Sequence, residues 1–175
     1  GGVGWDRAEG IRQVGRYLWS KGHDRIGFLG GEPDSIVTIE RKQAYSDALA
    51  ELGLVEDPAA VKYGCFSAKG TKKRILEIAE TGVTAVVCIS DLLACTAVKE
   101  LIRAGYSVPE DISVTGYDNL PPSEYSQPPI TTLSQNRIHI GKTTFFLLQQ
   151  MKNGIHIKSV MLLPELLQRT SVRDI

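Results

Sequence analysis

The sequence lacks an apolar run that approaches the roughly 18 residues needed to span a membrane, and no basic segment followed by an apolar one opens it. It also lacks an excess of charge, because 20 Lys and Arg balance 20 Asp and Glu. Proteins that hold duplex DNA by its phosphates usually carry a basic excess or stripe. The basic group from Lys69 to Arg74 is typical of a solvated helix face. We therefore expect neither a membrane protein nor tight DNA binding by this chain alone.

The sequence is also poor in side chains that carry metal, redox or nucleophilic chemistry. Its three cysteines, Cys65, Cys88 and Cys95, have no metal-ligand spacing, and two lie in apolar runs. None of the three histidines lies near a cysteine or in a nucleophile motif, and the sequence has no phosphate loop or dinucleotide-binding glycine fingerprint. These absences predict a protein that is not an enzyme, needs no cofactor or metal, and works in a reducing compartment.

What the sequence has in quantity is an alternation of helical and strand patterns. Apolar residues at helical spacing, followed by glycine or a polar turn, predict helices over 9–21, 38–52, 69–80 and 91–104. Short apolar runs, typical of buried strands, lie at 26–29 and 84–89, and further strands are predicted at 61–63 and 112–117. Because single helices separate these strands, we expect an α/β fold with a parallel sheet flanked by helices on both sides.

The alternation ends after Asp118. Residues 120–129 hold four of the eight prolines, so this segment is expected to be irregular. A long amphipathic helix is predicted over 136–152, and a final apolar run over 160–167 is predicted as the last strand. A proline-rich break between a sheet and a distant helix is typical of a connection between two lobes.

The expected ligand site lies beyond the carboxyl ends of the strands, where parallel sheets bind their ligands. Polar or aromatic residues follow three of the four strands: Phe66, the pair Ser90-Asp91, and Asp118. Arg41, near the start of the second helix, is expected to reach the same edge. An aromatic ring, carboxylates and a guanidinium together suit a small polyol, because the ring stacks on the sugar while the charged groups bind its hydroxyls.

Each of these residues also has an ordinary structural interpretation. Asp91 lies between a strand and a helix, where an aspartate often caps the helix. Asp118 is placed to open the proline-rich turn, Phe66 to join the core, and Arg41 to pair with an acidic neighbour on the surface. The convergence of compatible groups on one edge of the sheet favours the ligand site.

Several motifs resemble those of the LacI/GalR-type transcriptional regulators. Residues 21–31, KGHDRIGFLGG, are similar to the family's GH-x-x-I-x-x-(I/L)-x-G signature, and residues 108–119, VPEDISVTGYDN, to its VPxDISVxGYDD segment. PPITTL at 128–133 resembles the PPLTT crossover, and LPEL at 163–166 resembles part of the terminal strand. These motifs occur in the family's order over nearly the whole chain.

The resemblance implies the fold of the periplasmic sugar-binding proteins, in which two α/β lobes hold a ligand between them. It divides the chain into a remnant of the first lobe (1–22), the second, effector-binding lobe (23–127), a crossover with a helix of the first lobe (128–155), and a terminal strand and tail (156–175). The rest of the first lobe and a helix-turn-helix head are expected before this region. Such a region is expected to expose apolar surface and to be prone to self-association.

The resemblance also assigns roles to the residues at the strand ends. Arg41 matches an arginine that grips effector hydroxyls or carboxylates, and Asp118 matches a carboxylate that accepts hydroxyl donors. Phe66 falls where some members place an aromatic ring against the sugar.

Three further matches lie at the edges of this site. Ser90-Asp91 occupies the position of the family's Asn-Asp pair, with a serine where the amide would be. Gln135 matches a polar hinge residue in the crossover, and Asp6 matches the aspartate at the entry to the first helix.

The function implied by the resemblance is the effector-sensing region of a cytoplasmic transcriptional regulator, usually a repressor, that works as a homodimer. A small effector, a sugar or sugar derivative first and a nucleobase or protein co-repressor otherwise, changes the angle between the lobes and repositions heads on operator DNA. The alternative is a periplasmic sugar-binding protein of a transporter, which shares the fold but has a secretory leader in place of a DNA-binding head. A doubly wound enzyme is a second alternative, which turnover would distinguish.

Overall fold

A six-stranded sheet organises most of the computed structural model, which describes residues 2–64, 67–156 and 158–175. Parallel pairing joins the first five strands, and the last pairs antiparallel with its neighbour. In spatial order the strands are β3 (Val61–Lys62), β2 (Ile26–Leu29), β4 (Ala85–Cys88), β5 (Ser113–Tyr117), β6 (Thr131–Ser134) and β8 (Glu165–Leu167).

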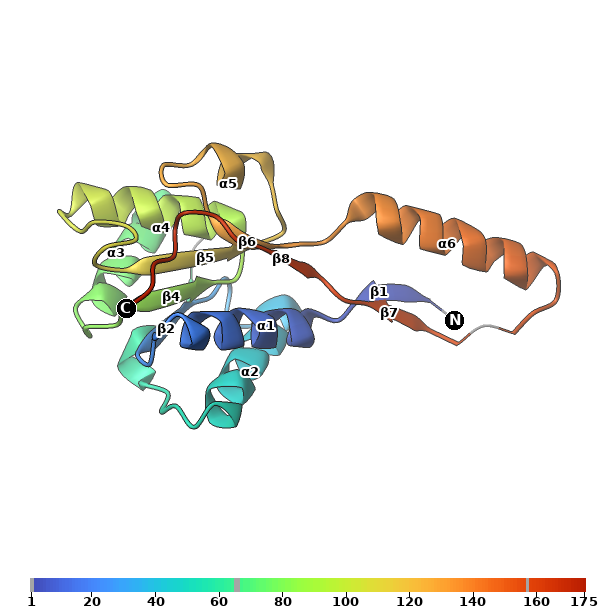
Figure 1. Ribbon diagram of the computed structural model, residues 1–175, viewed down its shortest axis with the longest axis horizontal. Coiled ribbons are helices and arrows are strands. Elements are labelled where there is room, and N and C mark those ends of the chain that lie inside the picture. Colours follow the sequence, from blue (N-terminus) through green and yellow to red (C-terminus); the bar gives the residue numbers. More distant parts are fainter. Residues whose placement is uncertain (1, 65–66, 157) are drawn as a thin grey trace.

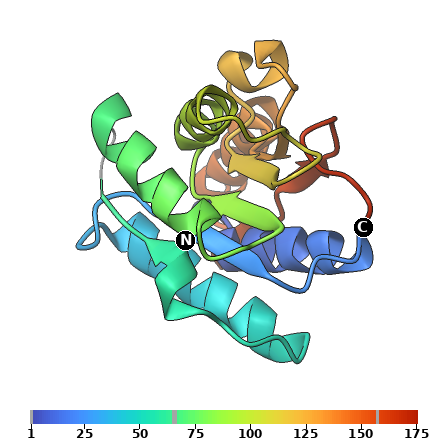
Figure 2. The ribbon, with the colours of Figure 1, turned by 90° about the vertical axis from the view of Figure 1, so that its left-hand side faces the viewer.

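Helices cover both faces of this sheet (Figures 1 and 2). On one face α1 (Arg7–Ser20) packs against α2 (Ile36–Glu51), and on the other α3 (Ala68–Ala79) packs against α4 (Asp91–Arg103). The strands β2, β4 and β5 are buried at every position; β2 and β4 are continuous apolar runs, as expected for buried parallel strands, whereas β5 also buries Ser113 and Thr115. This layered unit is called the body below, and it confirms the expected α/β fold with a parallel sheet between helices.

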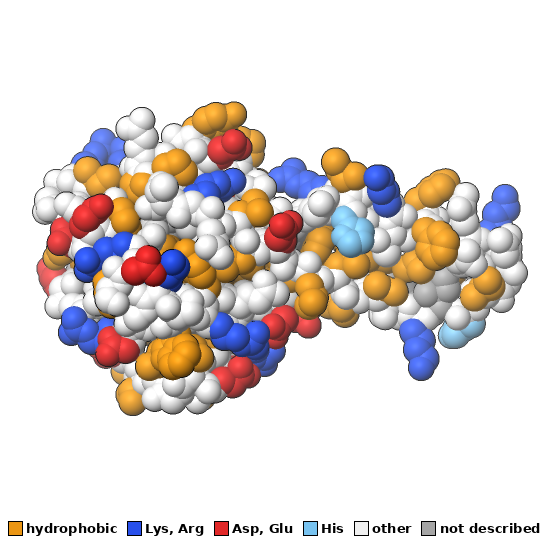
Figure 3. All heavy atoms as spheres, viewed as in Figure 1, with side chains coloured by type: hydrophobic (Ala, Val, Ile, Leu, Met, Phe, Trp, Pro, Cys, Tyr) orange, Lys and Arg blue, Asp and Glu red, His pale blue; other side chains and the backbone are white. Residues whose placement is uncertain are grey.

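An arm projects from the body (Figure 1). It consists of β1 (Val3–Trp5), α6 (Arg137–Lys152) and β7 (Val160–Leu162), with β1 and β7 paired in parallel. Within the described ranges α6 buries none of its side chains, and large apolar residues such as Phe145 and Phe146 are exposed. Figure 3 accordingly shows apolar and basic side chains over the surface of the arm. No described helix is both long and apolar enough to cross a bilayer.

The final apolar run differs from the single strand expected over 160–167. The structure divides it at Leu163-Pro164: β7 joins β1 in the arm, whereas β8 joins β6 in the body. Proline has no backbone N–H to donate to a neighbouring strand. The chain can therefore leave one sheet and enter the other at Pro164 without leaving a backbone N–H of that residue unpaired.

Two further elements depart from expectation. The proline-rich segment contains one short helix, α5 (Pro121–Tyr125), which packs against α4; proline is compatible with the first turn of a helix. The helix expected to belong with the first lobe, α1, packs into the body, because the apolar face formed by Ile11, Val14 and Leu18 is buried in its core.

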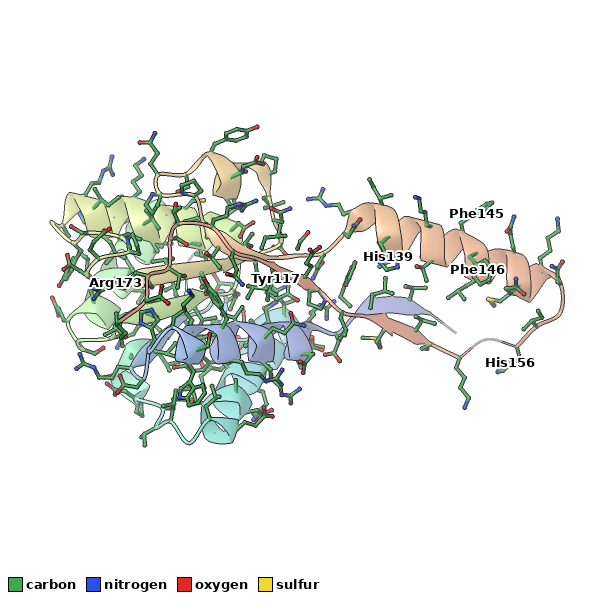
Figure 4. The ribbon with its side chains drawn as sticks, viewed as in Figure 1. Tyr117, His139, Phe145, Phe146, His156 and Arg173 are labelled. Atoms are coloured by element: carbon green, nitrogen blue, oxygen red, sulfur yellow. The ribbon has the colours of Figure 1, made fainter. Side chains whose placement is uncertain are left out.

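His23 fixes the C-terminal tail to the amino end of the sheet. Its buried ring places Nε2 3.1 Å from the carbonyl oxygen of Arg173 and Nδ1 2.9 Å from the hydroxyl of Thr84. A carbonyl only accepts, so Nε2 carries the proton and Nδ1 accepts from Thr84. Figure 4 shows Arg173 at the end of the body away from the arm. Burial lowers the pKa of His23 below its usual 6.5, although the Arg173 carbonyl opposes the shift.

We predict that His23 makes the stability of the chain depend on pH below neutrality. The unfolded chain takes up a proton at His23 near pH 6.5, while the folded chain resists it; stability is therefore lost as the pH falls through this range. The melting temperature of His23→Gln should depend less on pH between about 7.5 and about 5.5 than that of the unaltered chain. His139→Gln, at an exposed position, is the control. Equal pH dependence in all three proteins would contradict the assignment.

Candidate functional site

Arg41 lies at the carboxyl end of the sheet, where the sequence places it. Its side chain leaves α2 and is buried, with 5% of the residue exposed. One guanidinium nitrogen donates to the carbonyl oxygen of Ile89, directly after β4, and the other lies 3.6 Å from Asp118 Oδ1. The group stacks on the ring of Tyr117, 3.5 Å from its centroid. Burial lowers the pKa of Arg41, and Tyr117 and Asp118 oppose this. The expected pair of Arg41 and Asp118 is thus brought together.

Asp118 sits in a strained turn directly after β5. Its φ is +105° and that of Asn119 is +51°, a region that residues with a Cβ seldom adopt. Burial raises the pKa of Asp118, whereas the charges of Arg41 and then Arg137 lower it. Its side chain remains 33% exposed, so it can accept hydrogen bonds from a ligand. Strained residues of this kind are frequent at binding sites.

Ser90 and Asp91 have structural partners within the body. The Ser90 hydroxyl caps α4 by accepting from the Leu93 amide at 3.3 Å. The Asp91 carboxylate, fully buried, accepts from the Thr132 hydroxyl and from the Leu120 amide, each at 2.6 Å. Burial raises its pKa, and these two hydrogen bonds oppose the rise. Serine rather than aspartate caps the helix, and Asp91 joins α4 to β6 and to the start of α5.

Asp6 and Gln135 lie in the segments that connect the arm to the body. Asp6 caps α1 by accepting from the Glu9 amide at 2.9 Å, and its own amide donates to Leu162 of β7 at 2.8 Å. Gln135 follows β6 and lies close to Tyr117. Phe66 falls outside the described residues. Of the predicted site residues, Arg41 and Asp118 lie close together, and Asp6 and Gln135 lie in two of the segments between arm and body, which are called the hinge below.

A hollow of about 520 Å³ opens at the junction of the arm and the body. Asp6 is the predicted site residue that lines it, beside Trp5, Arg7 and Glu40. Arg7 and Glu40 form an ion pair at 2.8 Å across its wall. This volume is in the range of small-molecule sites, and Trp5 supplies an aromatic surface beside carboxylates.

Two residues of this region were not singled out from the sequence. The ring of Tyr117 lies under the Arg41 guanidinium. In the sequence it is the last residue of a buried strand, and nothing there distinguishes it from an ordinary core residue. Arg169 holds the turn after Asp118 by donating to Asn119 Oδ1 at 2.8 Å and to the Ile130 carbonyl at 2.9 Å. Its partners lie 50 and 39 residues away along the chain, so no local pattern indicates them.

We predict that Asp91→Ala lowers the free energy of unfolding by about 2–4 kcal/mol, because it leaves two buried donors unpaired. Urea denaturation measures this loss. Asp34→Ala, which removes an exposed carboxylate, should change stability by less than about 0.5 kcal/mol. If Asp91→Ala lowers the free energy of unfolding by less than about 1 kcal/mol, the buried hydrogen bonds of its carboxylate do not stabilise the fold as proposed.

Comparisons with known proteins identify the family of the chain. The profile of the periplasmic binding protein-like domain family matches residues 16–172. The HTH-type transcriptional repressor PurR of Vibrio atlanticus is 36% identical over 172 residues, which cover 95% of this chain and 51% of that repressor. The HTH-type transcriptional repressor CytR of Escherichia coli K12 is 35% identical over 145 residues, which cover 82% of this chain and 42% of that protein. The chain therefore spans about half the length of these relatives.

Solved structures of regulators share the fold. A complex of the transcriptional regulator CelR with cellobiose superposes with a TM-score of 0.83 at 32% identity, over 97% of this chain and 53% of that one. The Lac repressor dimer bound to operator and the anti-inducer ONPF superposes with a TM-score of 0.85 at 26% identity, over 98% of this chain and 60% of that one. The chain belongs to the periplasmic binding protein-like domain family, among the effector-binding domains of the LacI-type transcriptional regulators.

Proposed function

We propose that this chain binds a small polyhydroxylated effector at the edge formed by Arg41 and Asp118, and that binding controls a DNA-binding head outside the chain. The observation that carries the proposal is the buried Arg41, held on Tyr117 and 3.6 Å from Asp118. Arg41 offers donors and Asp118 offers acceptors within a few ångströms of each other. Vicinal hydroxyls, which both donate and accept, suit such a pair.

The electrostatics of the pair favour a neutral ligand. The carboxylate of Asp118 offsets much of the charge of Arg41, so a ligand that binds both groups need not carry charge. The cellobiose complex of the similar regulator CelR is consistent with a sugar.

The proposed connection to DNA is supported by the position of the site. The charge of Arg7, at the start of α1, acts on Arg41, and that of Arg137, at the start of α6, acts on Asp118, so the pair lies near two of the segments that join arm and body. A ligand there can shift the angle between the two parts only by the difference in its affinity for the two arrangements. Similarity to HTH-type repressors and to the operator-bound Lac repressor dimer supports a homodimer that acts on operator DNA in the cytoplasm.

We predict that Asp118→Asn and Arg41→Lys each weaken effector binding by about tenfold or more while the protein stays folded, since each loses charge-assisted hydrogen bonds. The measurement is the rise in melting temperature of the regulator, with its head, in a panel of sugars, sugar phosphates, nucleosides and purines.

Matched controls are Asp24→Asn, exposed before β2, and Arg103→Lys, exposed on α4. Both should keep the full shift. A full shift in Asp118→Asn would remove Asp118 from the site. A shift with purines alone would replace the sugar by a nucleobase. No shift with any compound would count against a small-molecule effector.

A further inference from the structure

Tyr117 lies between the candidate site and the three connections of the arm. The first connection is Asp6 before α1, the second is Gln135 before α6, and the third is Leu163-Pro164 between β7 and β8. Figure 4 shows Tyr117 at the boundary of arm and body. One face of its ring carries the Arg41 guanidinium, so the residue touches the site directly.

The hydroxyl of Tyr117 lies where α1, β6 and the third connection come together. Gly10, in the first turns of α1, shows how closely they meet: a Cβ placed on it would lie 2.7 Å from Pro164 Cγ, 3.0 Å from Tyr117 Oη and 3.2 Å from Leu133 Cδ1. The hydroxyl, a proline of the connection to β8 and a residue of β6 therefore all approach the first turns of α1 at Gly10. The ring spans the distance between Arg41 and this meeting point.

The Tyr117 hydroxyl is buried and, among the described atoms, has no hydrogen-bond partner. A buried tyrosine hydroxyl normally has one, and leaving it unpaired is costly. Gln135 is close enough to lower the pKa of Tyr117, against the larger rise that burial causes, but no hydrogen bond of ordinary geometry joins the two. A small movement at the second connection would bring the amide and the hydroxyl together.

We propose that Tyr117 is a positioning residue that links Arg41 to the hinge, and that its hydroxyl bonds to Gln135 in a second arrangement of arm and body. An effector that moves Arg41 tilts the ring beneath it. The tilt carries the hydroxyl toward or away from Gln135 and so favours one arrangement. The inference deepens the proposed function and rests on it for the identity of the site.

The first test compares two buried tyrosines. Tyr45, 2% exposed, donates from its hydroxyl to the Ile26 carbonyl at 2.7 Å. Tyr45→Phe should lower the melting temperature by several degrees, because it breaks a satisfied bond. Tyr117→Phe should leave the melting temperature unchanged or raise it, because its hydroxyl is unpaired here. A fall in Tyr117→Phe as large as in Tyr45→Phe would overturn the proposal.

The second test measures the link to the hinge by amide hydrogen exchange. The reporter is the Asp6 amide, which bonds to Leu162 across the first connection. Arg41→Lys takes the flat guanidinium off the ring, and should speed exchange at Asp6 by about threefold or more. In a Tyr117→Phe background the same substitution should have little further effect. The Thr84 amide, bonded to Arg25 at the other end of the sheet, is the internal control.

If Arg41→Lys changes exchange at Asp6 by the same factor in both backgrounds, the hydroxyl transmits nothing and the proposal is wrong. Neither test uses an effector, so a negative result leaves the proposed sensing function standing. Conversely, failure of every compound in the thermal panel leaves both tests informative.

Discussion

The burial of the Arg41 guanidinium is the constraint on which this edge of the sheet depends. A cation removed from water must be compensated by nearby acceptors, or it destabilises the fold. The Ile89 carbonyl, the Asp118 carboxylate and the face of Tyr117 provide that compensation from two adjacent strands. The turn after β5 accordingly accepts an unfavourable backbone conformation, and Arg169 holds its far side. A charged group placed in this way also provides directed donors for a ligand.

The body and the arm differ in how completely their apolar surfaces are buried. In the body two helical layers enclose the sheet, and its apolar side chains form one core. In the arm a single helix lies beside two strands; none of the described side chains of this helix is fully buried, and Phe145, Phe146 and Leu148 are exposed. The chain spans about half the length of the repressors that it matches. A rigid body joined by three connections to a second part is an arrangement in which a ligand at the junction can change their relative angle.

The elements with strong local patterns were predictable. The apolar runs at 26–29, 84–89 and 112–117 contain β2, β4 and β5, and glycine follows α1, α2 and α4 within a few residues. The edge at which Arg41 and Asp118 meet followed from the parallel topology alone, since the carboxyl ends of parallel strands share one edge. For the same reason Arg41 and Asp118 could be placed together from the sequence.

What could not be predicted depends on contacts far apart in sequence. Asp91 has the position of a helix cap, but Thr132, 41 residues away, and Leu120 take its carboxylate into the interior. The run from 160 to 167 has one apolar pattern, yet its halves join different sheets.

The sequence by itself determined the α/β alternation, the family and the pair at the strand ends, because these are written in local periodicity and in motifs. Only the tertiary structure decided that the Asp91 carboxylate is buried and hydrogen-bonded within the body, whereas that of Asp118 remains accessible. It also decided that α1 packs with the body, and that Tyr117 lies between Arg41 and the connections. The physical reason is that burial and hydrogen-bond partners are properties of segments brought together by folding, and no single segment carries them.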